Sequence, residues 1–235
     1  MNLYDLYQNL DDEIHDLIVE NNRRDVELLT SPFLLKVSDE YYHADIKVMI
    51  FGKETNGWIK YEDTKDIDDI LDCYDGFYNS GECYTYSGQF WNGFKLLKSM
   101  LESIYKMKRI SFIWNNIVKI GKNGKGFPVR TYQPIIKPHL NPIITKELDI
   151  LKPNIIILLT GPNSSNGPYD NVIDDIFNNP KRDKINGFEE RQLCNINIMN
   201  AQVCLRTYHP AFLYRNDISR YYKTICREVA EKIKV

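Results

Sequence analysis

The sequence predicts an α/β protein, folded as a three-layer α/β/α sandwich around a central, mainly parallel sheet of four strands. Continuous apolar runs at residues 46–51 and 155–161 stop at a glycine, which is typical of strands that are buried on both faces. Segments with apolar residues at spacings of three and four alternate with these runs and indicate helices. The 235 residues suffice for one hydrophobic core, so we expect a single domain over residues 1–235.

The N-terminal part begins with a helical extension over residues 1–30, because its apolar positions within 2–29 follow the spacing of an amphipathic helix. Ser31-Pro32 ends this helix, and Ile46–Phe51 is the first predicted strand. Residues 59–87 form an insertion rich in acidic residues and tyrosines, with a short helix inside it. We interpret the acidic run over 62–75 as a solvated face, with binding of a protein partner as the alternative.

The rest of the chain alternates helices with strands. Helices are expected at Phe90–Tyr105, Leu140–Leu151, Val172–Phe177 and Asp217–Ile233. Strands are expected at Ile110–Trp114, Ile155–Gly161, Leu193–Ile198 and Gln202–Leu205. Residues 178–187 carry only a weak pattern and are expected to form a loop.

The composition narrows the class of protein. A net charge of −2 gives no global attraction for nucleic acid, so phosphate contacts would depend on the local patch of Lys119, Lys122, Lys125 and Arg130. A solvated loop with lysines is the commoner outcome for such a patch. The five cysteines form no Cys-x-x-Cys pair, which predicts free thiols and no close-spaced metal site. No apolar run reaches membrane-spanning length and no signal-peptide pattern begins the chain, so we expect a cytoplasmic protein without membrane contact.

Four loops follow predicted strands and should meet at one edge of the sheet, because ligands of parallel sheets bind beyond the carboxyl ends of the strands. These loops are Gly52–Trp58, Asn115–Gly121, Gly161–Asn163 and Thr207–Arg215. They bring together a carboxylate, two neighbouring amides, an imidazole and several aromatic rings. Amides read the edge of a planar heterocycle, aromatic rings stack on its face, and a carboxylate holds water for attack. The sequence therefore predicts a base-binding pocket with a hydrolytic group.

In the order and spacing of its motifs, the chain resembles the uracil-DNA glycosylase superfamily over roughly residues 46–233. The first motif of that family stands here as Gly52–Gly57, and its His-Pro motif before the last helix stands as His209–Arg215. Between them, Gly88–Leu97 is similar to the segment with the base-stacking Phe, Asn116–Lys119 to the strand end with the base-reading Asn, and Glu147–Gly161 to the helix and strand before the glycine turn.

The resemblance implies a role for each residue at these positions. Glu54 would hold water for attack on the sugar C1′, with a structural acid that caps the loop as the alternative. His209 would donate a hydrogen bond to the base oxygen, with a structural histidine as the alternative. Asn116 would read the base edge, or Asn115 if the register differs by one, because side chains alternate along a strand. Phe90 would stack on the flipped base, with a core position as the alternative.

The resemblance further implies contacts around the base and with DNA. Gly52, Gly161 and Asn56 would complete the base pocket. The wedge that fills the gap in the duplex and the clamp on its phosphates would be Phe212, Leu213, Tyr214 and Arg215. Independently of the resemblance, the basic patch with Lys119, Lys122 and Lys125 is a second candidate for phosphate contacts.

The chain departs from the family pattern in ways that affect the substrate. Thr55 replaces the usual proline, and Asn56 replaces the tyrosine that excludes bulky pyrimidines in uracil-specific members. The cluster-binding cysteines of some branches are absent, so no cofactor is implied. The expected function is a DNA N-glycosylase with DNA as its partner. The alternatives are a catalytically inactive member that binds nucleic acid or protein, and a small-molecule hydrolase on the same fold.

Overall fold

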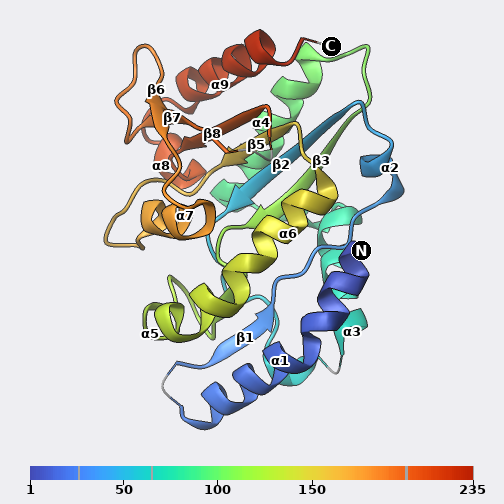
Figure 1. Ribbon diagram of the computed structural model, residues 1–235. Helices are drawn as coiled ribbons and strands as arrows, with labels where there is room; N and C mark the ends of the chain where they lie inside the picture. Colours follow the sequence, from blue (N-terminus) through green and yellow to red (C-terminus); the bar gives the residue numbers. More distant parts are fainter. Residues whose placement is uncertain (26, 65, 199–200, 235) are drawn as a thin grey trace.

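A central β-sheet with helices on both faces organises the computed structural model, which describes residues 1–25, 27–64, 66–198 and 201–234 (Figure 1). The sheet contains β2 (Ile46–Gly52), β3 (Ile110–Asn116), β5 (Ile155–Leu158), β6 (Arg182–Lys184), β7 (Leu193–Ile196) and β8 (Val203–Thr207). Its strand order is β3-β2-β5-β8-β7-β6. The predicted α/β class with a mainly parallel sheet is confirmed.

The predicted number of four strands is wrong, since this sheet has six within the described part of the chain. The strands β3, β2, β5 and β8 pair in parallel, and β7 and β6 extend the sheet with antiparallel pairing. One of the added strands, Arg182–Lys184, lies in the stretch that was expected to be a loop. The sequence did not predict this short edge strand because its residues are polar and carry no apolar pattern.

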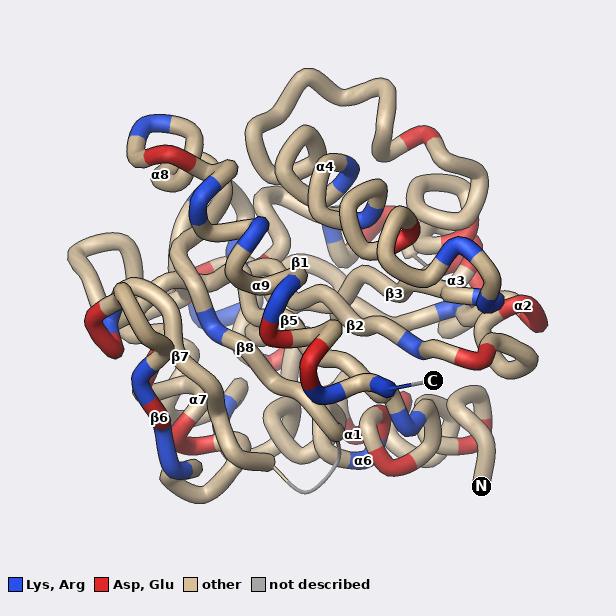
Figure 2. Tube along the Cα trace, turned by 90° about the horizontal axis from the view of Figure 1, so that it is seen from above, with Lys and Arg blue, Asp and Glu red and all other residues tan. Residues whose placement is uncertain are grey.

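Helices cover the two faces of the sheet, and Figure 2 views these layers edge-on. One face carries α4 (Gln89–Ile104), α8 (Pro210–Leu213) and α9 (Ile218–Lys232), which contact one another. The other face carries α6 (Asn141–Leu151) and α7 (Tyr169–Phe177). The helix α1 (Leu3–Arg23) packs on α6 and on α3 (Ile67–Tyr74), as expected for an amphipathic helix with one apolar face. Basic and acidic residues are interspersed along the trace in Figure 2.

A second, two-stranded sheet was not expected from the sequence. It pairs β1 (Leu29–Pro32) with β4 (Ile120–Lys122) in antiparallel orientation. The remaining short elements are α2 (Asp39–Tyr42), α5 (Val129–Thr131), 3₁₀ turns at Tyr61–Asp63 and Glu82–Thr85, and π-helical segments at Asp75–Asn79 and Tyr132–Leu140.

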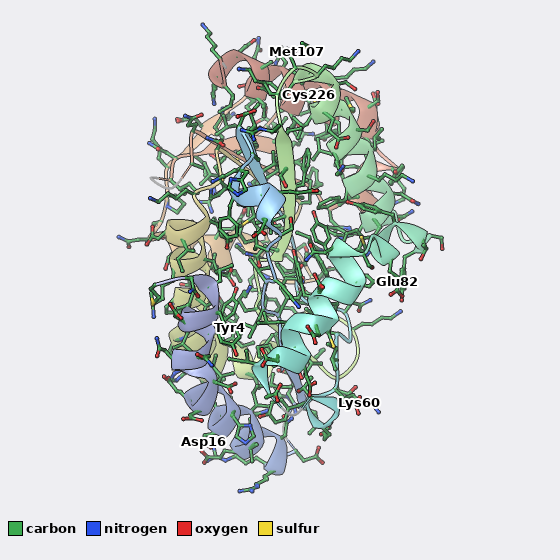
Figure 3. The ribbon with its side chains drawn as sticks, turned by 90° about the vertical axis from the view of Figure 1, so that its right-hand side faces the viewer. Tyr4, Asp16, Lys60, Glu82, Met107 and Cys226 are labelled. Carbon is green, nitrogen blue, oxygen red and sulfur yellow. The ribbon has the colours of Figure 1, made fainter. Side chains whose placement is uncertain are left out.

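The insertion over residues 59–87 packs against β3 instead of extending into solvent. Its helix α3 (Ile67–Tyr74) buries Ile67 and Leu71 and leaves Asp68 exposed, so its acidic residues form the expected outer face. The hydroxyls of Tyr74 and Tyr78 donate hydrogen bonds to backbone oxygens of β3, at 2.9 Å and 3.0 Å. Figure 3 shows this segment from outside, with Lys60 and Glu82 labelled near its two ends. The buried tyrosines therefore fix the insertion beside the carboxyl ends of the strands.

Candidate active site

A cavity of about 810 Å³ lies where β2, β3 and β8 end. It contains six of the residues proposed from the sequence, namely Gly52, Glu54, Asn56, Phe90, Asn116 and His209. Its other lining residues come from the loop after β2, the insertion, the start of α4 and the end of β3: Lys53, Thr55, Gly57, Trp58, Ile59, Cys73, Gly76, Phe77, Glu82, Tyr86, Gly88, Trp91 and Trp114. The cavity thus brings together residues that are far apart in the sequence.

Asn116, and not Asn115, lines this cavity. The two side chains point to opposite faces of the sheet because they are neighbours on a strand. Asn116 is 2% exposed, and its Nδ2 has no hydrogen-bond partner among the described residues. Gly52 is its partner across β2 and β3, and a Cβ added to Gly52 would lie 2.5 Å from the Asn116 Oδ1. The glycine therefore provides the space in which the amide sits.

Asn115 belongs to a buried polar network behind the sheet. Its Nδ2 donates a hydrogen bond of 2.9 Å to Glu147, and its Oδ1 accepts one of 3.0 Å from Lys119. Lys119 also forms a 2.7 Å ion pair with Glu147, and both side chains are fully buried. The expectation that Lys119 contacts a DNA phosphate is therefore wrong, because its ammonium group is enclosed in the core, where it is paired with Glu147.

Glu54 lies at the cavity wall and forms a hydrogen bond with a tyrosine that is distant in the sequence. The hydroxyl of Tyr169, at the start of α7, lies 2.5 Å from its Oε2 and 3.1 Å from the backbone oxygen of Asn166. Burial raises the pKa of Glu54, while the hydrogen bond from Tyr169 and the charge of Lys53 oppose that shift. The carboxyl group is therefore oriented by Tyr169 and lies close to the cationic Lys53.

His209 is held as a neutral hydrogen-bond donor. It occupies the N-cap of α8, where its Nδ1 accepts a hydrogen bond of 3.2 Å from the backbone N–H of Ala211. Because Nδ1 accepts, the proton of the neutral ring is on Nε2. Burial, with a smaller contribution from Lys53, lowers the pKa of His209 to about 4. The ring stacks near Phe90, with 5.6 Å between centroids and 23° between planes.

Aromatic side chains form much of the remaining wall. All three tryptophans of the chain, Trp58, Trp91 and Trp114, line the cavity together with Phe77 and Phe90. Trp58 lies 5.7 Å from both Phe77 and Trp114, measured between ring centroids. The cavity therefore offers aromatic faces beside a small number of polar groups, as sites for flat ligands do.

Several other proposed residues lie outside the cavity. Gly161 has a φ of +77° and packs behind the His209 loop, where an added Cβ would meet Tyr208 at 3.7 Å. Leu213 is fully buried, so the expectation that it wedges into DNA is wrong. Its neighbours in the proposed wedge, Phe212 and Tyr214, are 38% and 41% exposed. Arg215 is also exposed.

A second cavity of about 620 Å³ adjoins the first and shares Lys53 and Glu54 with it. Lys122 lines this second cavity, 3.8 Å from Glu27, and Lys125 is exposed nearby in the sequence. Lys53 was not among the site residues expected from the sequence, although it lies inside the first motif.

No motif in the sequence around Tyr169 indicated that this residue belongs to the site. It lies 115 residues from Glu54, and only the fold brings the two together.

Within the described ranges, no group of three or more His, Cys, Asp or Glu side chains is arranged to hold a metal ion. None of the helices in that part of the chain is long and apolar enough to cross a membrane. No protein-family model matches the chain, and no curated protein matches it. The interpretation of this site therefore depends on its geometry.

Proposed function

We propose that the chain is a hydrolase of the uracil-DNA glycosylase type, which flips a deaminated or modified base out of DNA and hydrolyses its N-glycosidic bond. The observation that carries this proposal is that Glu54, Phe90, Asn116 and His209 line one cavity at the carboxyl edge of a mainly parallel sheet. Exposed Phe212 and Tyr214, which follow His209 in the chain, support a contact with the duplex.

Recognition of the base would use the unpaired amide and an aromatic face. Asn116 lines the cavity, and its Nδ2, which has no partner in the described part of the chain, would donate to a base oxygen. Phe90 presents its ring beside this amide, since both lie within 4 Å of the Cβ position of Gly52. A flipped base needs such hydrogen bonds and stacking to offset the loss of its pairing in the duplex.

The reaction would be a metal-free displacement by water. Glu54 takes a proton from a water molecule whose oxygen attacks the sugar C1′, and the C1′–N bond breaks with its electron pair leaving on the base. The Nε2–H of neutral His209 donates a hydrogen bond to the base oxygen as negative charge develops. A neutral donor suits this role because it stabilises the charge without needing to transfer its proton.

Base release from oligonucleotides that contain uracil, hypoxanthine, xanthine or modified pyrimidines tests the proposal. Glu54→Gln should lower the rate by about 10²–10⁴-fold, as expected for loss of a general base. His209→Ala should lower it by about 10²–10³-fold, as for loss of one donor to a developing oxyanion. Glu82→Gln is the matched control, because Glu82 lies at the same cavity but is exposed.

Wild-type rates no higher than those of the Glu54→Gln, His209→Ala double variant on every base would refute the glycosylase proposal. Binding to DNA that weakens with salt, without any product, would then favour the inactive binding member.

A small-molecule hydrolase is the second candidate, and the acidic outer face of α3 favours it. Asp66, Asp68 and Asp72 are exposed on the insertion that lines the cavity, where they would repel a phosphate backbone. Cleavage of free nucleosides, together with failure to bind DNA, would identify this function.

A further inference from the structure

Lys53 lies where the two cavities meet. It lines both of them, as does Glu54, whereas each of the other lining residues belongs to one cavity alone. The residue is half-buried, so its side chain remains accessible. Its Nζ lies 4.6 Å from the ring centroid of Tyr169, whose hydroxyl is hydrogen-bonded to Glu54. One tyrosine therefore contacts both the amine of Lys53 and the carboxyl group of Glu54.

The amine of Lys53 is left without an acceptor. Within the part of the chain that the structure describes, it makes no hydrogen bond and no ion pair. The buried Lys119, by contrast, forms an ion pair with Glu147. A cation–π contact with the face of Tyr169 positions the amine of Lys53 but accepts none of its hydrogens in a conventional hydrogen bond. The amine therefore remains available to a ligand.

The electrostatics of the site place this amine near the groups proposed for base release. Beside the larger effect of burial, the charge of Lys53 acts to lower the pKa of both Glu54 and His209. Burial in turn lowers the pKa of Lys53, and the charge of Glu54 opposes that shift. Only a neutral amine attacks a carbonyl carbon, and burial increases the neutral fraction. Desolvated lysines form imines with carbonyl substrates in other enzymes.

We propose that Lys53 gives this site a second activity, in which its amine forms an imine with the aldehyde of an abasic sugar in DNA and the strand is then cleaved by β-elimination. The aldehyde carbon is C1′, the atom that loses the base in the proposed reaction. The inference rests on the proposed function for its substrate, because an abasic sugar is the product of base release. It goes beyond that function by adding a covalent step.

The step is balanced without an oxidant or a reductant. The Nζ of Lys53 adds to C1′ of the opened sugar, and the aldehyde oxygen leaves as water, which forms a protonated imine. Glu54 takes a proton from C2′, and the C3′–O bond breaks with its electron pair leaving on the phosphate oxygen. Water then hydrolyses the imine, which returns the free amine and leaves an unsaturated aldehyde on the cleaved strand.

The second cavity offers partners for the phosphate that leaves C3′. Lys122, Ser164 and Ser165 line this cavity together with Lys53. Lysine ammonium groups and serine hydroxyls are common contacts of DNA phosphates. The leaving phosphate therefore has polar groups beside the amine.

Reductive trapping on abasic DNA tests the inference. A duplex with one preformed abasic site is mixed with the wild-type protein and sodium cyanoborohydride, which reduces an imine to a stable secondary amine. A covalent adduct of protein and DNA should form, and mass spectrometry of its peptides should place the DNA on Lys53. Without the reductant, the strand should be cleaved at the abasic site. Because the site is made beforehand, the experiment needs no base release.

Lys53→Arg is the matched variant, because arginine keeps the positive charge and its guanidinium group stays protonated. This variant should lose both the adduct and the strand cleavage. Lys106→Arg is the control, since Lys106 is exposed between α4 and the start of β3, at the opposite edge of the sheet from the cavity. It should keep both. Peptide mapping of the wild-type adduct gives the answer even if Lys53→Arg fails to fold.

The outcomes separate this inference from the proposed function. Strand cleavage and an adduct on Lys53, without release of any base, would retain the inference and refute the glycosylase. Base release without an adduct on abasic DNA would retain the glycosylase and overturn the inference. An adduct that maps to another amine, or that forms equally well with Lys53→Arg, would also overturn it. An adduct on Lys53 without strand cleavage would overturn the elimination.

Discussion

Acidification should destabilise the protein through His209. Burial holds the pKa of this imidazole at about 4, against an ordinary value of 6.5. Between these two values the unfolded chain binds a proton that the folded protein does not bind, so stability falls as the pH falls from 6.5 to 4. At about pH 5 the unfolded imidazole is almost fully protonated and the folded one almost fully neutral. The free energy of unfolding should then be lower by about 2 kcal/mol from this group alone.

Urea unfolding at about pH 7.5 and about pH 5 measures this effect. The matched variant is His209→Asn, because asparagine keeps a side-chain acceptor at the N-cap of α8 and does not titrate. Wild type should lose about 2 kcal/mol more than the variant between the two pH values, since the contributions of all other groups cancel in the comparison. Equal losses in the two proteins would refute the buried, neutral state of His209.

Three further predictions concern the core and the carboxylate of Glu54. Lys119→Met should lower the free energy of unfolding by about 3–5 kcal/mol because it removes the positive charge that faces Glu147 in the core. Adding Glu147→Leu should restore most of that loss in the same urea assay. An unchanged midpoint for the single variant would mean that Lys119 is solvated. Tyr169→Phe should move the acidic limb of the pH–rate profile to higher pH, because the hydrogen bond from Tyr169 lowers the raised pKa of Glu54. If the limb does not move, Glu54 is not the general base whose protonation sets it. Leu213→Ala should cost about 2–5 kcal/mol of stability as a core truncation, whereas weaker DNA binding in a fully stable variant would favour a wedge.

The strands and the loops at their ends could be predicted from the sequence because their signals are local. A run of apolar residues that stops at Gly52 marks both the buried strand β2 and the place where a functional loop begins. The same reasoning placed Glu54 and His209 at one edge of the sheet, since parallel strands share the direction of their carboxyl ends. The edge strand Arg182–Lys184 could not be predicted, because its stability comes from pairing with β7 and its residues have no pattern of their own.

The choice between Asn115 and Asn116, by contrast, required the tertiary structure. Alternation along a strand shows that the two amides face opposite ways, but only the helices packed on each face decide which side holds the cavity. Lys119 is the same kind of case, because a lysine in a Gly/Lys-rich loop has the sequence pattern of a phosphate contact. Its actual partner, Glu147, is 28 residues away.

The sequence by itself determined the class of fold, the strand ends and the chemical groups that meet there. The tertiary structure decided which of those groups face a common space and how large that space is. Trp58, Phe77 and Trp114 come from a loop, an insertion and a strand, and they line one cavity only when α3 packs on β3. Cavity shape arises from contacts between residues distant in the sequence, and these leave no periodic signal in the chain. The carboxylate after Gly52 is therefore visible in the sequence, whereas the aromatic space beside it emerges only on folding.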